Sequence, residues 1–143
     1  MQGRILGIDY GKKRIGLAVS DPMRKIAQGL PTLTNSNLAQ VFTDLENIIS
    51  EHEIKKIVIG LPITMKAEVG KAAQVTNKFV TALKDRFELP TMVWDERLTS
   101  VLARRTMREL GKSPSKNKNK VDEIAAILIL QSYLDSIPHS FKD

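Results

Sequence analysis

Three acidic side chains stand beside apolar segments of this chain, where a charged group needs a partner. Asp9 ends an apolar run that begins at Ile5, Glu96 follows the apolar segment 91–95, and Asp122 opens a long apolar stretch. A carboxylate that is buried without a partner is costly. In open α/β sheets, functional sites collect at the carboxyl ends of the strands. If the first and last strands lie near each other, these carboxylates converge.

Three carboxylates without histidine or cysteine indicate one kind of chemistry. Hard oxygen ligands favour Mg²⁺ or Mn²⁺. Two such ions, about 4 Å apart, activate a water and stabilise the leaving oxygen when a phosphodiester is hydrolysed. The sequence has no cysteine and only two histidines, His52 and His139. A disulfide framework and a cysteine-based zinc site are therefore excluded, and a zinc site built from histidines is disfavoured.

Each of these acids also has a structural interpretation that the sequence leaves open. Asp122, at the start of the expected last helix, suits a helix cap or an interaction with the helix dipole. Glu96 is as well suited to an ion pair with Arg97 or Arg14 as to a metal. Asp9 could pair with Arg14, Lys13 or a bound metal ion. It is the most informative of the three, because it follows a solid apolar run and precedes a turn.

The net charge of +6 and the isoelectric point near 9.7 favour a polyanionic partner, nucleic acid above all. The charge is uneven, since four lysines occupy a segment without acids that ends next to Asp122. Phosphates neutralised there would steepen the salt dependence of binding. A solvated surface is the alternative for each cation. The candidate nucleic-acid contacts are Lys12, Lys13, Arg14, Arg97, Arg104, Arg108, Lys112, Lys116, Lys118 and Lys120.

The strands that must position the acids follow from the apolar runs. Segment 4–21 predicts two strands joined by a tight turn, and segment 25–30 predicts a third strand ended by Pro31. Two short apolar runs, 54–60 and 91–95, predict buried parallel strands.

Helical spacing of apolar residues predicts four helices. The first is capped within segment 35–37 and ends near Glu51, and the others span 71–87, 100–110 and 121–134. The element order β-β-β-α-β-α-β-α-α predicts the α/β class: a mixed five-stranded sheet, with an antiparallel start and then parallel strands, flanked by helices.

The length of 143 residues predicts a single domain over residues 1–143 with a core of its own. Met1 leads into a strand pattern without a signal peptide, and the longest apolar stretch, 124–130, is too short to span a bilayer. A cytoplasmic protein without membrane contact is expected.

Four segments resemble one known family in order and over nearly the whole chain. They are GIDYGKKRIGLAVSD at 7–21, IVIGLP at 57–62, WDERLTS at 94–100 and KVDEIAAILILQSYL at 120–134. The chain resembles the YqgF family, also called RuvX, small bacterial proteins of the ribonuclease-H-like superfamily. Actin-like ATPases begin with a similar first motif, but they need a second domain and a second phosphate loop, for which this chain is too short.

The resemblance implies a ribonuclease-H-like fold and an acidic site at Asp9, Glu96 and Asp122. Family members are described as Holliday junction resolvases by analogy with RuvC, and are also linked to trimming the 5′ end of precursor 16S ribosomal RNA. The second role is favoured, which predicts an RNA endonuclease of ribosome maturation using Mg²⁺ or Mn²⁺. A DNA junction resolvase, which needs a symmetric dimer, and a non-catalytic RNA-binding module are the alternatives. The expected oligomeric state is a monomer or a homodimer.

Overall fold

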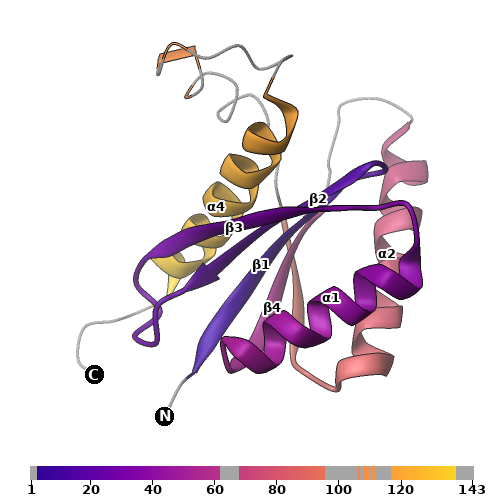
Figure 1. The fold of residues 1–143 in the computed structure, drawn as a ribbon, viewed down its shortest axis with the longest axis horizontal. Coiled ribbons are helices and arrows are strands. Elements are labelled where there is room, and N and C mark those ends of the chain that lie inside the picture. The colour runs from indigo at the N-terminus through magenta and orange to yellow at the C-terminus, as the bar shows by residue number, and fades with distance from the viewer. Residues whose placement is uncertain are drawn as a thin grey trace.

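Five strands form one mixed sheet in the order β3-β2-β1-β4-β5 (Figure 1). The computed structural model describes residues 3–61, 68–95, 106, 108–109, 111 and 117–137. β2 pairs antiparallel with both β1 and β3, whereas β4 pairs parallel with β1 and β5 pairs parallel with β4, so the predicted mixed sheet is confirmed. The elements are β1 (Arg4–Tyr10), β2 (Arg14–Ser20), β3 (Ala27–Thr34), α1 (Leu38–Glu51), β4 (Ile54–Leu61), α2 (Glu68–Phe87), β5 (Thr91–Asp95) and α4 (Lys118–Ser136).

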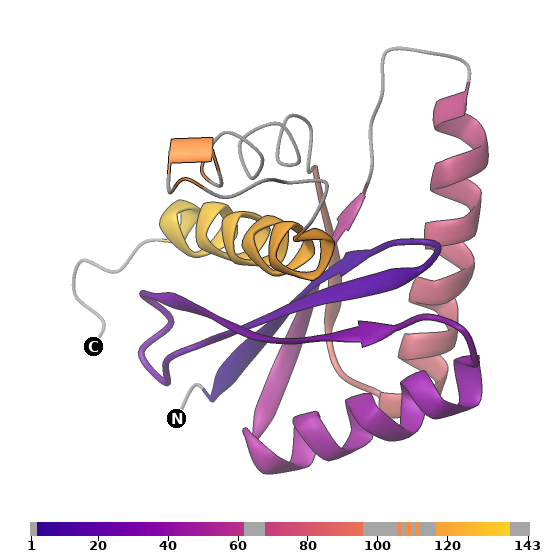
Figure 2. The same ribbon diagram turned by 45° about the horizontal axis from the view of Figure 1, so that its top comes forward.

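Helices cover both faces of the sheet: α4 lies on one face, and α1 and α2 lie on the other (Figure 2). Successive side chains of a strand point to opposite faces. In β1, Leu6 and Ile8 accordingly join the apolar core under α1 and α2, whereas Ile5 packs with α4. None of the described helices is long and apolar enough to cross a membrane.

Glycines on the face of the sheet under α4 allow the helix to approach the strands closely. A methyl group at Gly16 would lie 2.1 Å from the backbone oxygen of Asp122, and one at Gly7 would lie 2.8 Å from Cβ of Leu130. Both distances are shorter than van der Waals contact, so these two positions exclude any side chain. The helix therefore rests directly on β1 and β2.

Strand β3 differs from the prediction at both ends. The expected strand 25–30 is observed at Ala27–Thr34, and Pro31 lies inside it instead of ending it. Proline cannot donate to a strand ladder, so it is tolerated in a strand only at an edge or a bulge. β3 is an edge strand of this sheet, which explains why the expectation was wrong.

Asn37 caps α1, as predicted, with its side chain accepting a hydrogen bond from the backbone of Gln40. The starts of α2 and α4 differ from the predictions. α2 begins at Glu68, three residues before the predicted start, and α4 begins at Lys118. The early start of α4 removes Lys118 and Lys120 from the expected basic loop and puts them in the first helical turn. Most of the predicted helix 100–110 lies outside the described residues.

Asp21 organises the connection between β2 and β3. Its carboxylate accepts hydrogen bonds from the backbone N–H groups of Lys25, Ile26 and Met23, at 2.7, 2.8 and 3.2 Å. Burial alone would raise the pKa of Asp21, but these backbone donors outweigh it and lower the pKa from its usual value.

The lowered pKa of Asp21 makes a prediction about acid stability. A carboxyl group whose pKa is lower in the folded than in the unfolded state stabilises the fold above its unfolded pKa, and this contribution disappears as the pH falls through the folded value. We expect Asp21→Asn to be less stable than the wild type at pH 7, and the difference to shrink below pH 4 or so. Urea unfolding of the two proteins at pH 7 and below pH 4 or so measures this difference in stability. A difference independent of pH would contradict the assignment.

The close approach at Gly16 predicts a strong effect of one methyl group. Gly16→Ala places a Cβ against a helix backbone, which cannot move alone, and should destabilise the fold by about 2–3 kcal/mol. Gly29→Ala is the matched control, since the nearest atom there is Oε2 of the flexible Glu123 side chain. It should cost clearly less. Equal free energies of unfolding for the two variants would show that α4 is not held in this position.

Candidate active site

Asp9 lies on the α4 face of the sheet, near the carboxyl end of β1. It shares that face with Ile5 and Gly7, four and two residues earlier, by strand alternation. Its cross-strand neighbours are Gly16 on β2 and Gly60 on β4. Both neighbours are glycines, so the adjoining strands place only backbone directly beside the half-buried Asp9.

Asp122 reaches the same place from above the sheet. The backbone of Asp122 lies against Gly16, and its Cβ would be 3.3 Å from a methyl group on that glycine. Since Gly16 pairs with Asp9, the structure brings these two acids to one level on one face. Asp122 lies in the second turn of α4, beyond the first turn where the helix dipole acts, so the interpretation of Asp122 as a helix-start residue is wrong.

Asp122 forms an ion pair with Arg14. Nε of Arg14 donates to Oδ2 of Asp122 at 2.6 Å, and the two side chains are 30% and 22% exposed. A charge-assisted hydrogen bond of this length is strong, although partial exposure to water weakens the pair. The sequence suggests Arg14 as a partner for Asp9 or Glu96, or as a phosphate contact, so its pairing with Asp122 is a new feature.

Glu96, the third predicted acid, lies outside the described residues, directly after β5. The register shows where that strand runs: Gly60 pairs with Trp94, and Leu61 pairs with Asp95. β4 therefore lies between β1 and β5, and the axes of β1 and β5 are about 10 Å apart. At the level of Asp9 the strand between them contributes only Gly60.

The donor set that the described residues assemble fits a hard divalent cation. Asp9 and Asp122 supply carboxylate oxygens, the ligand type of Mg²⁺ and Mn²⁺. Since a Cβ at Gly16 would collide with the backbone of Asp122, the glycine at this position allows α4 to bring Asp122 to the level of Asp9. Among the described residues alone, no group of three or more histidine, cysteine, aspartate or glutamate side chains forms a metal site.

The basic turn after Asp9 is fixed by a residue that the sequence suggested as a helix cap. The Asn35 side chain donates to the oxygen of Gly11 at 2.7 Å, and its backbone N–H donates to the oxygen of Lys13 at 2.8 Å. The side chains of Lys12 and Lys13 are exposed on this turn. Their backbone is thus held in place while their charged ends face solvent.

A groove of about 850 Å³ lies between the start of β2, the edge strand β3 and the first turn of α4. Three cations and one acid line it, and Nζ of Lys120 lies 3.5 Å from Oε1 of Glu123. Thr32 ties its two walls together by donating to the backbone oxygen of Asn119 at 3.0 Å. The lining includes Arg14, Pro31, Thr32, Lys118, Lys120 and Glu123.

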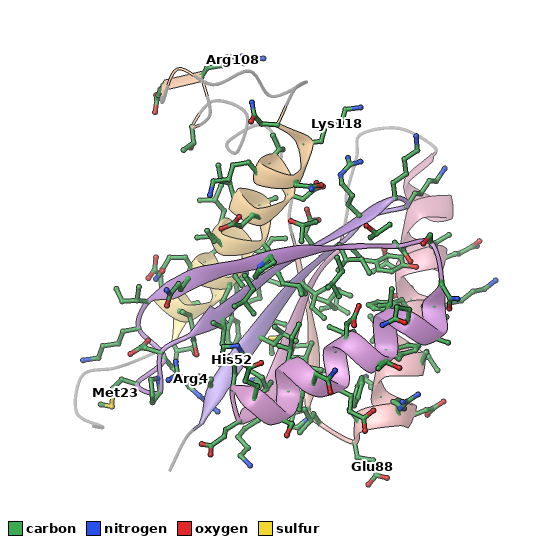
Figure 3. The ribbon with its side chains drawn as sticks, viewed as in Figure 1. Arg4, Met23, His52, Glu88, Arg108 and Lys118 are labelled. Atoms are coloured by element: carbon green, nitrogen blue, oxygen red, sulfur yellow. The ribbon has the colours of Figure 1, made fainter. Side chains whose placement is uncertain are left out.

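The remaining candidate cations are placed only in part. Lys118 and Arg108 are exposed and lie at the same end of the molecule, opposite His52 and Glu88 (Figure 3). The other four, Arg97, Arg104, Lys112 and Lys116, lie outside the described residues.

Sequence reasoning missed the uncharged residues of this region. Gly16 and Gly60 interrupt otherwise apolar strands, and a glycine inside a strand often marks a close backbone approach. That signal was present in the sequence. Thr32 and Asn119 gave no comparable signal, because their contact joins segments far apart in the chain.

A mixed five-stranded sheet of this order, with an acid on the first strand meeting an acid on the closing helix, defines a ribonuclease-H-like fold. The RuvC of T. thermophilus, solved in complex with a Holliday junction substrate, has this fold: its TM-score is 0.56 at 12% identity, covering 92% of this chain and 93% of that one. The family model described as "RuvX: Holliday junction resolvase" matches residues 3–136. The chain belongs to the RuvX family, as the sequence motifs indicated.

Curated relatives extend over almost the same length. A protein of Ruminiclostridium cellulolyticum is 47% identical over 140 residues, covering 97% of this chain and 99% of its own. One of Thermoanaerobacter pseudethanolicus is 45% identical, covering 93% and 96%. Both carry the name "Putative pre-16S rRNA nuclease". The expected class, a nuclease that hydrolyses phosphodiester bonds in nucleic acid, is thus confirmed.

The groove makes a prediction about nucleic-acid binding. Lysines that neutralise phosphates release counterions, so each lost contact lowers the slope of log K against log salt by about 0.7 for a single strand. Lys118→Gln with Lys120→Gln should therefore reduce the slope by about 1.4. Fluorescence anisotropy with a single-stranded RNA, titrated at several salt concentrations, measures this.

The matched control is Lys78→Gln with Lys84→Gln, which removes the same charge from α2 on the other face of the sheet. Its slope should stay at the wild-type value. If both pairs lower the slope equally, the effect belongs to net charge and not to the groove.

Proposed function

We propose that this chain is a divalent-metal-dependent endonuclease that processes the 5′ end of precursor 16S ribosomal RNA during ribosome biogenesis in the cytoplasm. The observation that carries the proposal is the meeting of Asp9 and Asp122 beside Gly16. The names of the relatives supply the RNA substrate. RNA is the favoured partner, and the enzyme acts as a monomer or a homodimer.

The residues divide into two roles in this proposal. Asp9, Glu96 and Asp122 hold Mg²⁺ or Mn²⁺, with two ions as the expected number. Bound in this way, the ions supply an activated water and stabilise the charge on the leaving oxygen. The phosphate backbone of the nucleic acid is held by Lys118, Lys120 and the other cations near the groove. Contacts of this kind position the strand without reading its sequence.

The position of Arg14 supports a path from the groove to the acids. Arg14 belongs to both, since it lines the groove and contacts Asp122. A strand whose phosphates follow the groove is therefore led toward the carboxylates. The opposite face of the sheet is filled by α1 and α2 and by an apolar core, so it offers no equivalent path in the described part of the chain.

A cleavage assay on two substrates tests the proposal. Purified protein is incubated with precursor 16S RNA and, in parallel, with a four-way DNA junction, each with Mg²⁺, Mn²⁺ or EDTA. We expect RNA cleavage that requires the metal and falls about a hundredfold or more in Asp9→Asn, since even outer-shell changes at metal sites cost about 10- to 100-fold. Asp85→Asn, an exposed position on α2, is the matched control and should cleave normally.

The other outcomes point to the alternatives. Paired cuts in the junction alone would identify a resolvase, consistent with the description of the family, and would require a symmetric dimer. Binding of RNA without cleavage would leave a binding module. Cleavage that Asp9→Asn does not change would contradict the metal site.

A further inference from the structure

Arg14 takes part in two sites at once. Its Nε holds Oδ2 of Asp122 at 2.6 Å, and its side chain also lines the groove with Lys118 and Lys120. The proposed nuclease function assigns the first site to a divalent cation and the second to phosphates. The binding of the divalent cation and the binding of the phosphates therefore both involve the guanidinium group of Arg14.

The contact with Asp122 opposes cation binding. A carboxylate oxygen that accepts a short hydrogen bond from a guanidinium coordinates a metal ion more weakly. The positive charge of the guanidinium also repels a divalent cation nearby. Arg14 and Asp122 are partly exposed, at 30% and 22%, so water can replace either partner and the pair can open.

A phosphate in the groove offers Arg14 a better partner. Guanidinium groups bind phosphate oxygens in a bidentate manner, and the groove already presents Lys118 and Lys120 to the same anion. The exchange needs only a side-chain movement, because the backbone of Arg14 is paired with Thr34 in the sheet and the preceding turn is held by Asn35.

We propose that Arg14 is an exchangeable positioning residue: it holds Asp122 while the groove is empty and moves to a substrate phosphate when a strand enters. Asp122 is then released for the divalent cation. Metal and nucleic acid thereby strengthen each other's binding, and by linkage the effect is the same in both directions. The inference rests on the proposed function, since it assumes that Asp122 is a metal ligand.

Mn²⁺ binding without RNA tests the first half. The loss of the free Mn²⁺ signal in electron paramagnetic resonance gives the affinity. Arg14→Gln should bind Mn²⁺ about three- to tenfold more tightly than the wild type, because Asp122 has lost its competitor. Lys78→Gln removes the same charge from α2, where its side chain is exposed, and should change the affinity less than about twofold.

Binding of RNA tests the second half. The affinity of a fluorescent single-stranded RNA, shown by gel to be intact after the titration, is measured with and without Mn²⁺. The wild type should bind the strand more tightly when Mn²⁺ is present. In Arg14→Gln this dependence should be reduced to about twofold or less, while Lys78→Gln should retain it.

Two results would overturn the inference. If Arg14→Gln binds Mn²⁺ more weakly than the wild type, Arg14 orients Asp122 for the metal instead of competing with it. If Arg14→Gln and Lys78→Gln behave alike, only general charge is at work. Circular dichroism confirms folding, and if Arg14→Gln does not fold, Arg14→Met replaces it, because methionine keeps an unbranched side chain but has no hydrogen-bond donor for Asp122.

Failure of the proposed function has a different signature. Asp122→Asn should weaken Mn²⁺ binding if Asp122 is a ligand. If Asp122→Asn and Asp9→Asn leave Mn²⁺ binding unchanged, the metal site itself is wrong. If they weaken Mn²⁺ binding while Arg14→Gln behaves like Lys78→Gln, the metal site is supported and only the coupling through Arg14 is rejected.

Discussion

The close packing of α4 on β2 is the constraint on which the rest of this site depends. A side chain at Gly16 would push the helix away from the sheet, and Asp122 would leave the level of Asp9. Gly7 has the same role further along the helix, under Leu130. Apolar packing of α4 against the sheet therefore does more than stabilise the fold, because it also brings two carboxylates together against their mutual repulsion.

The same packing explains where the positive charge collects. The first turn of α4 carries Lys118 and Lys120, although cations at a helix N-terminus are unfavourable because the helix dipole is positive there. Thr32 anchors this turn to β3, and Glu123 pairs with Lys120. The two lysines thus lower the local stability of the helix but create a positive electrostatic potential that attracts phosphates. The tertiary contacts of the helix compensate for the lost stability.

The sequence predicted the architecture well because apolar runs and helical spacing report burial directly. It placed Asp9 at a strand end and indicated a mixed sheet, and both are observed. It misjudged features that depend on position in the fold: Pro31 ends a strand in a central position but not at an edge, and the true start of α4 moved Asp122 out of the first turn. The pairing of Arg14 with Asp122 joins residues 108 positions apart, which no local pattern could reveal.

Pro31 has a further consequence for how this protein meets other chains. The exposed edge of a sheet offers a row of backbone donors and acceptors to which another strand can be added. A proline within β3 interrupts that row beside the groove. The edge is therefore a poor template for a second polypeptide, and the protein can keep it open to a polyanion without inviting self-association along it.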